Sequence, residues 1–124
     1  MKLAFDTNPA VNTIRRYSAL ELVVGTTHLR QPCIVSAQRI ISDWKLNSIQ
    51  SLTVNELMPI LELEPEVILL GTGERQIFPP PDVMAFCLAR RIALEPMDLG
   101  AACRTFNVLV QEDRLAVGAF AIGV

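Results

Sequence analysis

The sequence predicts an α/β fold, in which helices alternate with the strands of a parallel or mixed sheet. Two observations lead to this prediction. From Thr53 onward, segments with the periodicity of amphipathic helices alternate with short apolar runs. Before Thr53 the apolar runs are shorter and turn residues separate them, which is typical of antiparallel strands. The predicted helices are 53–63, 81–92 and 99–111, and the strands that follow them are 67–70, 93–95 and 115–122.

The N-terminal third of the chain is expected to form antiparallel strands joined by tight turns. Residues 1–10 contain an Asn-Pro pair and are expected to form an irregular arm. Within 11–36 the apolar runs are short, and Gly25 marks a turn between two of them. The segment 36–47 fits neither periodicity, although Trp44 within it is expected to pack at the edge of the core. These strands would add a β layer to the domain or extend its main sheet.

Three local signals define the first helix and the strand after it. Thr53 and Glu56 have the spacing of a capping box, in which each side chain satisfies the other residue's backbone N–H. Pro65 ends the helical pattern. The run Val67–Leu70 is apolar at four successive positions, which indicates a strand buried on both faces. We therefore expect this run to be the central strand of the sheet.

The second and third helices each carry a start signal. Pro81 suits the first turn of a helix, and Asp82 complements the positive end of the helix dipole. Asp98 is expected to cap the third helix by accepting a hydrogen bond from an early backbone N–H. In that helix, Phe106 is predicted to face the core and Arg104 to lie on the polar face.

Length, composition and charge limit the functions that the chain can have. The 124 residues match one domain, so we expect residues 1–124 to fold as a single unit. Apolar residues make up 51% and charged residues 19%, which indicates either a large core or a surface that a partner covers. The net charge is −2, and adjacent basic residues occur only at Arg15-Arg16 and Arg90-Arg91. Nucleic-acid binding, which needs a basic stripe, is therefore not expected.

Cysteine and histidine usage argues against metal and disulfide chemistry. Cys33, Cys87 and Cys103 are odd in number and far apart, and His28 is the only histidine. We expect reduced thiols, no metal site and no cofactor. The sequence starts without the apolar core of a signal peptide, and no apolar run approaches the roughly 20 residues that span a bilayer. These features predict a cytoplasmic protein without a transmembrane segment.

The loop Gly71-Thr72-Gly73 is the first candidate binding site. It follows the expected buried strand, and ligands of open α/β sheets bind outside the carboxyl ends of strands. The glycines allow either a tight turn or a close approach of backbone N–H groups to a ligand. Arg75 would add positive charge. The loop lacks the spacing of a GxGxxG motif or of a P-loop, so a plain turn and an anion or ligand site both stay open.

The start of the third helix is the second candidate. The run Asp98–Asn107, which includes Cys103, Arg104 and Thr105, brings an acid, a thiol, a guanidinium and an amide within three helical turns. A cysteine near a helix N-terminus beside an arginine can have a lowered pKa, but a free cysteine is more often a small core residue. Arg104 could pair with a neighbouring acid or bind a ligand. We expect no catalytic residue, and we expect Cys103 to be unreactive at neutral pH.

Three stretches of the sequence together resemble a known family. They are Pro65–Gly73, Ile92–Asp98 and Ala102–Leu109 with Glu112 and Arg114, and Tyr17 and Trp44 extend the similarity into the N-terminal half. The chain is similar to the family of domains of unknown function that includes the mitochondrial complex I assembly factor 3 and the adipogenesis-associated domain protein. The resemblance covers nearly the whole chain. The family pattern has Thr, Tyr and Gly where this chain has Leu99, Phe106 and Asp113.

The resemblance implies a three-layer β+β/α fold with a central mixed five-stranded sheet, the helices on one face and the N-terminal antiparallel strands as an added layer. It also implies a pocket shared by the Gly71–Gly73 loop and the start of the third helix. No activity is implied, and the mitochondrial member acts through protein partners. We therefore expect a non-catalytic protein-interaction or assembly-factor-like module with a protein partner. The alternative is a small-molecule or anion-binding protein, or a weak enzyme, that uses the same pocket; a homo-oligomer stays open.

Overall fold

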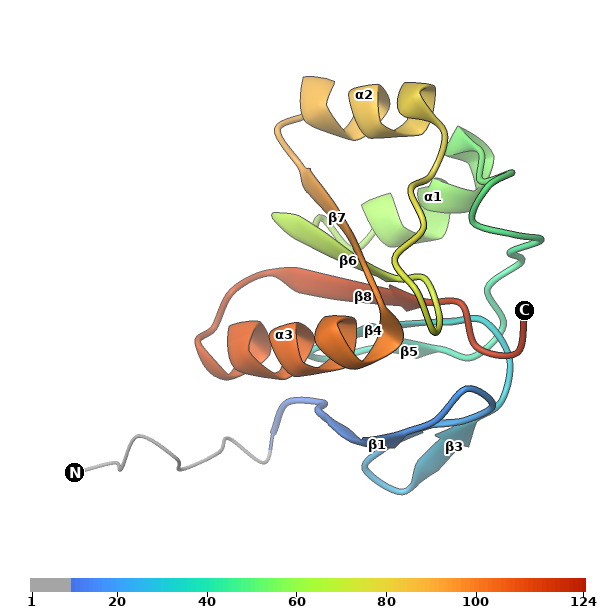
Figure 1. Cartoon of the computed structure of the whole chain (residues 1–124). Helices are drawn as coiled ribbons and strands as arrows, with labels where there is room; N and C mark the ends of the chain where they lie inside the picture. Colours follow the sequence, from blue (N-terminus) through green and yellow to red (C-terminus); the bar gives the residue numbers. More distant parts are fainter. Residues whose placement is uncertain (1–9) are drawn as a thin grey trace.

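The computed structural model describes residues 10–124, so the predicted arm over residues 1–10 lies, except for Ala10, outside the described residues. The described part forms two sheets and three helices (Figure 1). Its strands are β1 (Ile14–Tyr17), β2 (Leu22–Val24), β3 (Thr27–Leu29), β4 (Cys33–Ser36), β5 (Ile40–Ile41), β6 (Val67–Gly71), β7 (Ala93–Met97) and β8 (Ala116–Phe120). Its helices are α1 (Val54–Leu61), α2 (Pro81–Ala89) and α3 (Leu99–Gln111).

The central sheet is mixed and has the strand order β5-β4-β8-β6-β7. Strand β6 pairs in parallel with β7 and β8, whereas β4 pairs antiparallel with β8 and β5. A separate antiparallel sheet of order β1-β2-β3 lies next to α3 (Figure 1). The predicted α/β class, the mixed five-stranded sheet and the added antiparallel layer are therefore confirmed. The segment 36–47, which had no clear pattern, supplies the edge strand β5.

Helices cover both faces of the central sheet, which corrects the prediction that they lie on one face. Successive residues of a strand point to opposite faces. In β6, Leu69 belongs to a core cluster with Leu22 of β2 and Phe106 of α3. Ile68 belongs to a second core cluster, which contains Leu57 of α1 and the buried residues of α2. Thus α3 and the three-stranded sheet cover one face, and α1 and α2 cover the other (Figure 1).

The direction of the two crossover connections explains this arrangement. Helix α2 connects β6 to β7, its neighbour on one side. Helix α3 then connects β7 to β8, and this connection crosses β6, because β8 is the neighbour of β6 on the other side. Connections between parallel strands are almost always right-handed, so two connections that run in opposite directions place their helices on opposite faces. The sequence order alone does not reveal that reversal.

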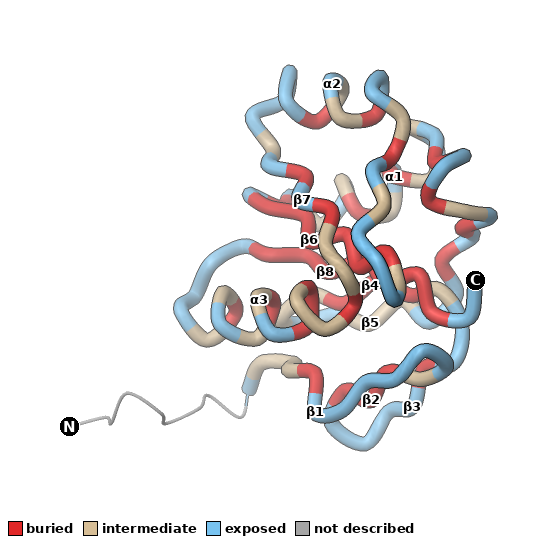
Figure 2. Tube along the Cα trace, in the orientation of Figure 1, coloured by how far each residue is buried: buried red, intermediate tan, exposed pale blue. Residues whose placement is uncertain are grey.

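Strands β6 and β8 of the sheet are entirely buried (Figure 2). Strand β8, rather than the predicted run 67–70, occupies the middle position, and β6 lies between β8 and β7. Small residues in β8 leave space for aromatic rings on the α3 side. A Cβ on Gly118 would lie 2.4 Å from the ring of Phe120, which packs edge to face against Phe106 with ring centroids 6.3 Å apart.

The predicted start signals of two helices form as hydrogen bonds. At α1, the Glu56 carboxylate accepts a bond from the backbone N–H of Thr53 at 2.8 Å. Trp44 is 3% exposed, and its indole N–H donates to the carbonyl oxygen of Glu56 at 2.8 Å, which fastens the segment before α1 to the helix. At α3, the Asp98 carboxylate accepts a bond from the N–H of Ala101 at 2.9 Å. The bounds of α3 are those that the sequence predicts.

Candidate functional site

The topology creates a crevice at the carboxyl ends of β6 and β7. These strands are parallel, so Gly71 at the end of β6 and Met97 at the end of β7 lie side by side. The chain leaves β6 toward α2 on one face and leaves β7 toward α3 on the other. Where neighbouring strands send their connections to opposite faces, the connecting segments separate and ligands of open α/β sheets bind between them. The two segments predicted as candidate sites therefore meet at one edge of the sheet.

Hydrogen bonds fasten the Gly71–Gly73 loop to the start of α3. The carbonyl oxygen of Gly73 accepts a bond from Leu99 N–H at 2.7 Å, and Thr72 N–H donates to Met97 at 2.8 Å. The Thr72 hydroxyl lies 2.6 Å from the carbonyl oxygen of Arg75. It also accepts a bond from the backbone N–H of Ile77 at 3.0 Å. Thr72 is only 6% exposed, so its hydroxyl stabilises the loop and does not face solvent.

A cleft of about 490 Å³ opens at this edge, and we call it the carboxyl-edge cleft. It is lined by Tyr17, Ser18, Ala19, Gly73, Glu74, Asp98, Leu99, Gly100 and Arg104. Of the predicted pocket residues, Gly73, Asp98 and Arg104 thus line one cavity. Gly71, Thr72, Cys103 and Thr105 do not line it. Sequence reasoning missed the wall formed by residues 17–19, because it comes from the β1–β2 turn and no local pattern marks it.

Arg104 and Tyr17 form the polar contact that crosses this cleft. Nη1 of Arg104 donates to the Tyr17 hydroxyl oxygen at 2.9 Å, although the two residues are 87 positions apart. Gly100 provides the space, since a Cβ there would lie 2.9 Å from that hydroxyl and 3.0 Å from Nη1. Within residues 10–124, Arg104 has no ion pair with Asp98 or Glu95. Arg104 therefore lines the cleft as an exposed cation bonded to Tyr17 and not as part of a structural ion pair.

The remaining predicted residues pack in the core or close to it. Cys103 is 1% exposed, and burial raises the pKa of its thiol to about 12, with a smaller contribution from the neighbouring Cys33. Arg104 opposes this shift only weakly. Gly71 is buried, and a Cβ there would lie 2.8 Å from the Phe120 ring. Thr105 is half-buried on α3. A thiol with so high a pKa is a poor nucleophile at neutral pH.

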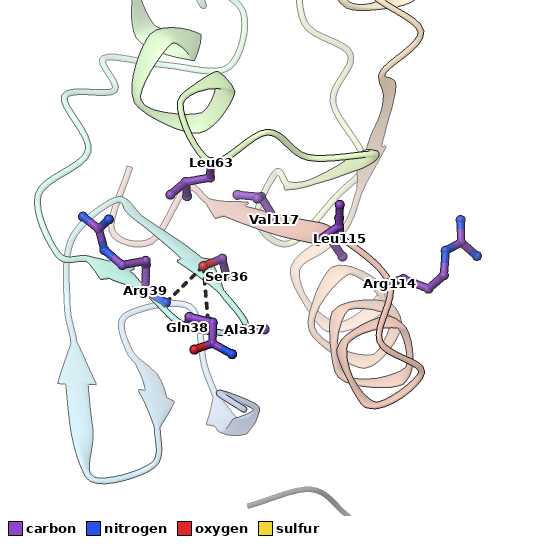
Figure 3. Close-up of a pocket in the computed structure, with 9 residues that line it drawn as sticks. Ser36, Ala37, Gln38, Arg39, Leu63, Arg114, Leu115 and Val117 are labelled. Carbon is purple, nitrogen blue, oxygen red and sulfur yellow. Dashed lines mark hydrogen bonds between the residues drawn. The ribbon is translucent and has the colours of Figure 1, made fainter. Parts of the chain in front are cut away.

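A second, smaller cleft lies where β4 ends and β8 begins, and we call it the amino-edge cleft. Its volume is about 220 Å³, and it is lined by Ser36, Ala37, Gln38, Arg39, Leu63, Arg114, Leu115, Ala116 and Val117 (Figure 3). The Ser36 hydroxyl accepts a bond from Arg39 N–H at 3.0 Å and so shapes one wall. Arg39 and Arg114 extend away from the cleft on either side of it (Figure 3). No sequence signal indicated this cleft, since three distant segments build it.

Two general features of the described chain bear on its function. No helix within residues 10–124 has the length and apolar character needed to cross a bilayer. In the same part of the chain, no three His, Cys, Asp or Glu side chains are placed to hold a metal ion.

The fold and the sequence place the chain in a known family. The model of the family described as "Protein of unknown function (DUF498/DUF598)" matches residues 14–121. The chain belongs to this family, which confirms the resemblance seen in the sequence. The match extends from β1 to just beyond β8 and so includes both clefts.

Named relatives of the chain come from bacteria and from vertebrates. The "13 kDa major membrane protein" of Francisella tularensis subsp. holarctica is 32% identical over 101 residues, which cover 81% of this chain and 82% of that protein. NADH dehydrogenase (ubiquinone) 1 alpha subcomplex assembly factor 3 of Danio rerio is 39% identical over 89% of this chain and 64% of its own length. The Bos taurus factor is 33% identical, with 87% and 59% covered. The chain thus spans about three fifths of these assembly factors.

Solved structures of bacterial proteins share the fold over almost the whole chain. A Xanthomonas campestris protein has a TM-score of 0.84 and 36% identity, with 98% of this chain and 93% of that chain covered. A Bordetella parapertussis protein has a TM-score of 0.83 and 30% identity, with 91% and 97% covered. A structure described as an outer membrane protein of Bartonella henselae has a TM-score of 0.79 and 27% identity, with 92% and 97% covered.

Proposed function

We propose that the chain is a non-catalytic protein-interaction module, similar in role to an assembly factor, that contacts its partner at the carboxyl-edge cleft. The observation that carries this proposal is the apolar surface at the mouth of the cleft. Tyr17, which lines it, is 43% exposed, and Leu20 in the same turn is 71% exposed. Ser18 N–H donates to Glu21 at 2.8 Å, so the turn is closed and holds Leu20 at its tip. Exposed aromatic and aliphatic side chains beside a cleft are typical of protein contact sites.

The relatives support a protein as the partner. Those named assembly factors are more than 30% identical to this chain in two species and match nearly all of it. Their names say that they assist assembly of NADH dehydrogenase. We propose that this chain likewise binds a protein that it helps to assemble. The proposal also includes the cytoplasmic location that the sequence predicts, where the three free thiols would stay reduced.

Capture experiments with matched variants test this function. We expect the tagged wild-type chain to retain a stoichiometric protein partner from lysate. Leu20→Ser should lose that partner, whereas Leu115→Ser should keep it, because Leu115 is similarly exposed at 59% but lies at the amino-edge cleft. Retention of the same partner by both variants would exclude the carboxyl-edge cleft as the contact site, and the absence of any stoichiometric partner would contradict the function.

Ligand binding at the same cleft is the second candidate function. A volume of about 490 Å³ is within the range of small-molecule sites, and the position at a topological switch point is where α/β proteins bind ligands. This candidate predicts a metabolite that copurifies with the chain. Native mass spectrometry of the gently purified protein would detect it as an added mass that Arg104→Ala removes. An unchanged mass in both samples contradicts this candidate.

A further inference from the structure

We infer that the carboxyl-edge cleft recognises a carboxylate beside an apolar side chain of the partner, and that Arg104 and Tyr17 hold this carboxylate. The inference rests on the proposed function and adds the chemistry of the partner segment to it. Two features of the cleft lead to it, namely the free hydrogen-bond donors of the pair and the glycine beneath the pair. The negative charges around the cleft then discriminate against a phosphate.

The pair presents several donors to the cleft. A guanidinium has five N–H donors, and the contact with Tyr17 uses one of them on Nη1. The Tyr17 hydroxyl accepts that bond, so its own hydrogen can still be donated. Within residues 10–124 no carboxylate lies within ion-pair distance of Arg104. A planar guanidinium with free N–H groups fits a carboxylate, which it can bind through two parallel hydrogen bonds.

The first turn of α3 is shaped to accommodate this pair. Both Nη1 of Arg104 and the Tyr17 hydroxyl lie close to the position that a Cβ at Gly100 would occupy. An alanine at this position would place its Cβ 2.9 Å and 3.0 Å from these two atoms, closer than side chains normally approach. The tips of Arg104 and Tyr17 would then have to move. Glycine at position 100 therefore allows the donors to lie where they do, at some cost in helix propensity.

The charges around the cleft disfavour a doubly charged ligand more than a singly charged one. Asp98 and Glu74 line the same cleft as Arg104, so acidic groups outnumber basic ones among its lining residues. The Asp98 carboxylate is hydrogen-bonded to Ala101 N–H and remains close to the helix start. A phosphate, with nearly two negative charges, would be repelled by these carboxylates more strongly than a carboxylate would. The apolar surface of Ala19 and the Tyr17 ring adjoins the donors and suits an apolar side chain next to the charge.

Three small probes test the inference directly. The probes are N-acetyl-leucine, N-acetyl-leucinamide, which differs from it in lacking the carboxylate, and inorganic phosphate. Each is titrated into the ¹⁵N-labelled chain while the amide signals of Gly73 and Gly100 are followed. We expect saturable shifts with N-acetyl-leucine and at least about tenfold weaker binding of the amide, because a charged hydrogen-bonded pair is lost. Equal binding of the amide, tighter binding of phosphate, or no shift with N-acetyl-leucine would overturn the inference.

Variants separate recognition from a structural role. Arg104→Gln and Tyr17→Phe should each weaken N-acetyl-leucine binding, whereas Arg39→Gln, at the amino-edge cleft, should not. Gly100→Ala is the sharpest variant, because it should raise the melting temperature through better helix propensity and yet weaken binding by displacing the pair. Unchanged probe affinity in Gly100→Ala and Arg104→Gln would overturn the assignment of this pair.

The outcomes also distinguish this inference from the proposed function. If probes do not bind but partner capture still depends on Leu20, the protein-interaction function stands and carboxylate recognition is excluded. If the probes bind as expected but no protein partner is captured, the cleft recognises carboxylates and the protein-interaction function fails.

Discussion

At the carboxyl ends of β6 and β7, glycine stands at two positions where a side chain would be strained or would displace a neighbouring side chain. Gly73 has a φ of 107°, a conformation that residues with a side chain rarely adopt. Gly100 lies under the contact between Arg104 and Tyr17. At the opposite ends of the same strands the chain uses non-glycine residues in the left-handed region near φ 60°, which is a different conformation from that of Gly73. Glu64 follows α1 with a φ of 52°.

The other two helix ends repeat that pattern. Arg91 follows α2 and Asp113 follows α3, each with a φ of 60°. This left-handed conformation costs a non-glycine residue roughly 1 kcal/mol relative to glycine. The amino-edge turns therefore carry a cost in stability, whereas the carboxyl-edge loop and the start of α3 carry glycine. The two edges therefore differ in where a glycine substitution can add stability, since the amino-edge turns can gain from it and the carboxyl-edge positions already hold glycine.

The largest expected effect is the loss of the whole fold, and with it both the carboxyl edge and the amino edge of the sheet. Leu69 is 1% exposed in β6, which lies between the two clefts. Leu69→Asp would place an unpaired charge in the core at a cost of several kcal/mol, comparable with the whole stability of a small domain. We expect no cooperative thermal unfolding by circular dichroism. Leu115→Asp, at a 59% exposed position, should still unfold cooperatively. A soluble, cooperatively folded Leu69→Asp protein would refute the placement of β6.

Buried thiols next to α3 should make stability fall at alkaline pH. Burial raises the pKa of Cys33 and of Cys103 from the ordinary 9.0 to about 12. Because the folded pKa lies above the unfolded one, the stabilisation is complete below pH 9 and is lost as the pH rises towards 12. Each thiol then accounts for about 1.4 kcal/mol per pH unit. Urea unfolding between pH 8 and pH 10.5 should show little change below pH 9 and this slope above it. Cys103→Ala should remove the share of one thiol and leave that of Cys33.

The same thiols should resist chemical modification. In the native protein near pH 7, Cys103 should react with a thiol reagent far more slowly than in the denatured chain, and no faster than Cys33, since both are buried. Fast and selective labelling of native Cys103 would reopen a nucleophilic role for it.

Removal of the α3 cap tests the carboxyl edge by itself. Asp98→Ala loses the bond from the carboxylate to Ala101 N–H and should cost about 1 kcal/mol. Asp98→Asn should retain most of the stability, because asparagine is an equally good cap. Chemical denaturation measures both. Equal losses for the two variants would mean that the charge of Asp98, and not its cap, stabilises α3.

Substitution to glycine at the amino edge should raise the free energy of unfolding, by slightly less than the Asp98→Ala substitution lowers it. Asp113→Gly and Arg91→Gly relieve the left-handed conformation after α3 and α2, and each should add up to about 1 kcal/mol. Glu112→Gly is the control, because Glu112 has a φ of −95° and gains nothing from glycine. The family pattern also has glycine where this chain has Asp113. Destabilisation by both substitutions would show that these side chains stabilise the turns.

Local signals made parts of the fold predictable and left others hidden. The Asp98 cap and the apolar run in β6 are encoded by adjacent residues, so the bounds of α3 and the burial of that strand follow from the sequence. The faces that the helices cover depend on the direction of the crossovers, which no short segment encodes.

The candidate site shows the same limit. Its Gly73–Asp98–Arg104 part could be predicted because parallel strands end at one edge. Tyr17 could not be placed there, because its contact with Arg104 spans 87 positions. Thr72 was grouped with the site, yet its hydroxyl bonds to the backbone of its own loop and to the carbonyl oxygen of Met97 at the end of β7.

The smallest expected effect on stability is that of Arg104→Ala, and it distinguishes a binding role of the carboxyl edge from a structural one. Arg104 is exposed, and its bond to Tyr17 lies at the surface, so Arg104→Ala should change the free energy of unfolding by about 0.5 kcal/mol or less. Partner or probe binding should nevertheless be lost. Arg39→Ala, at an exposed arginine of the amino edge, should leave both stability and binding unchanged. The opposite result is a free energy of unfolding that falls by about 1 kcal/mol or more, as expected for the loss of a charged hydrogen bond, while binding persists. Arg104 would then only fasten β1 to α3, and the carboxyl edge would serve stability alone.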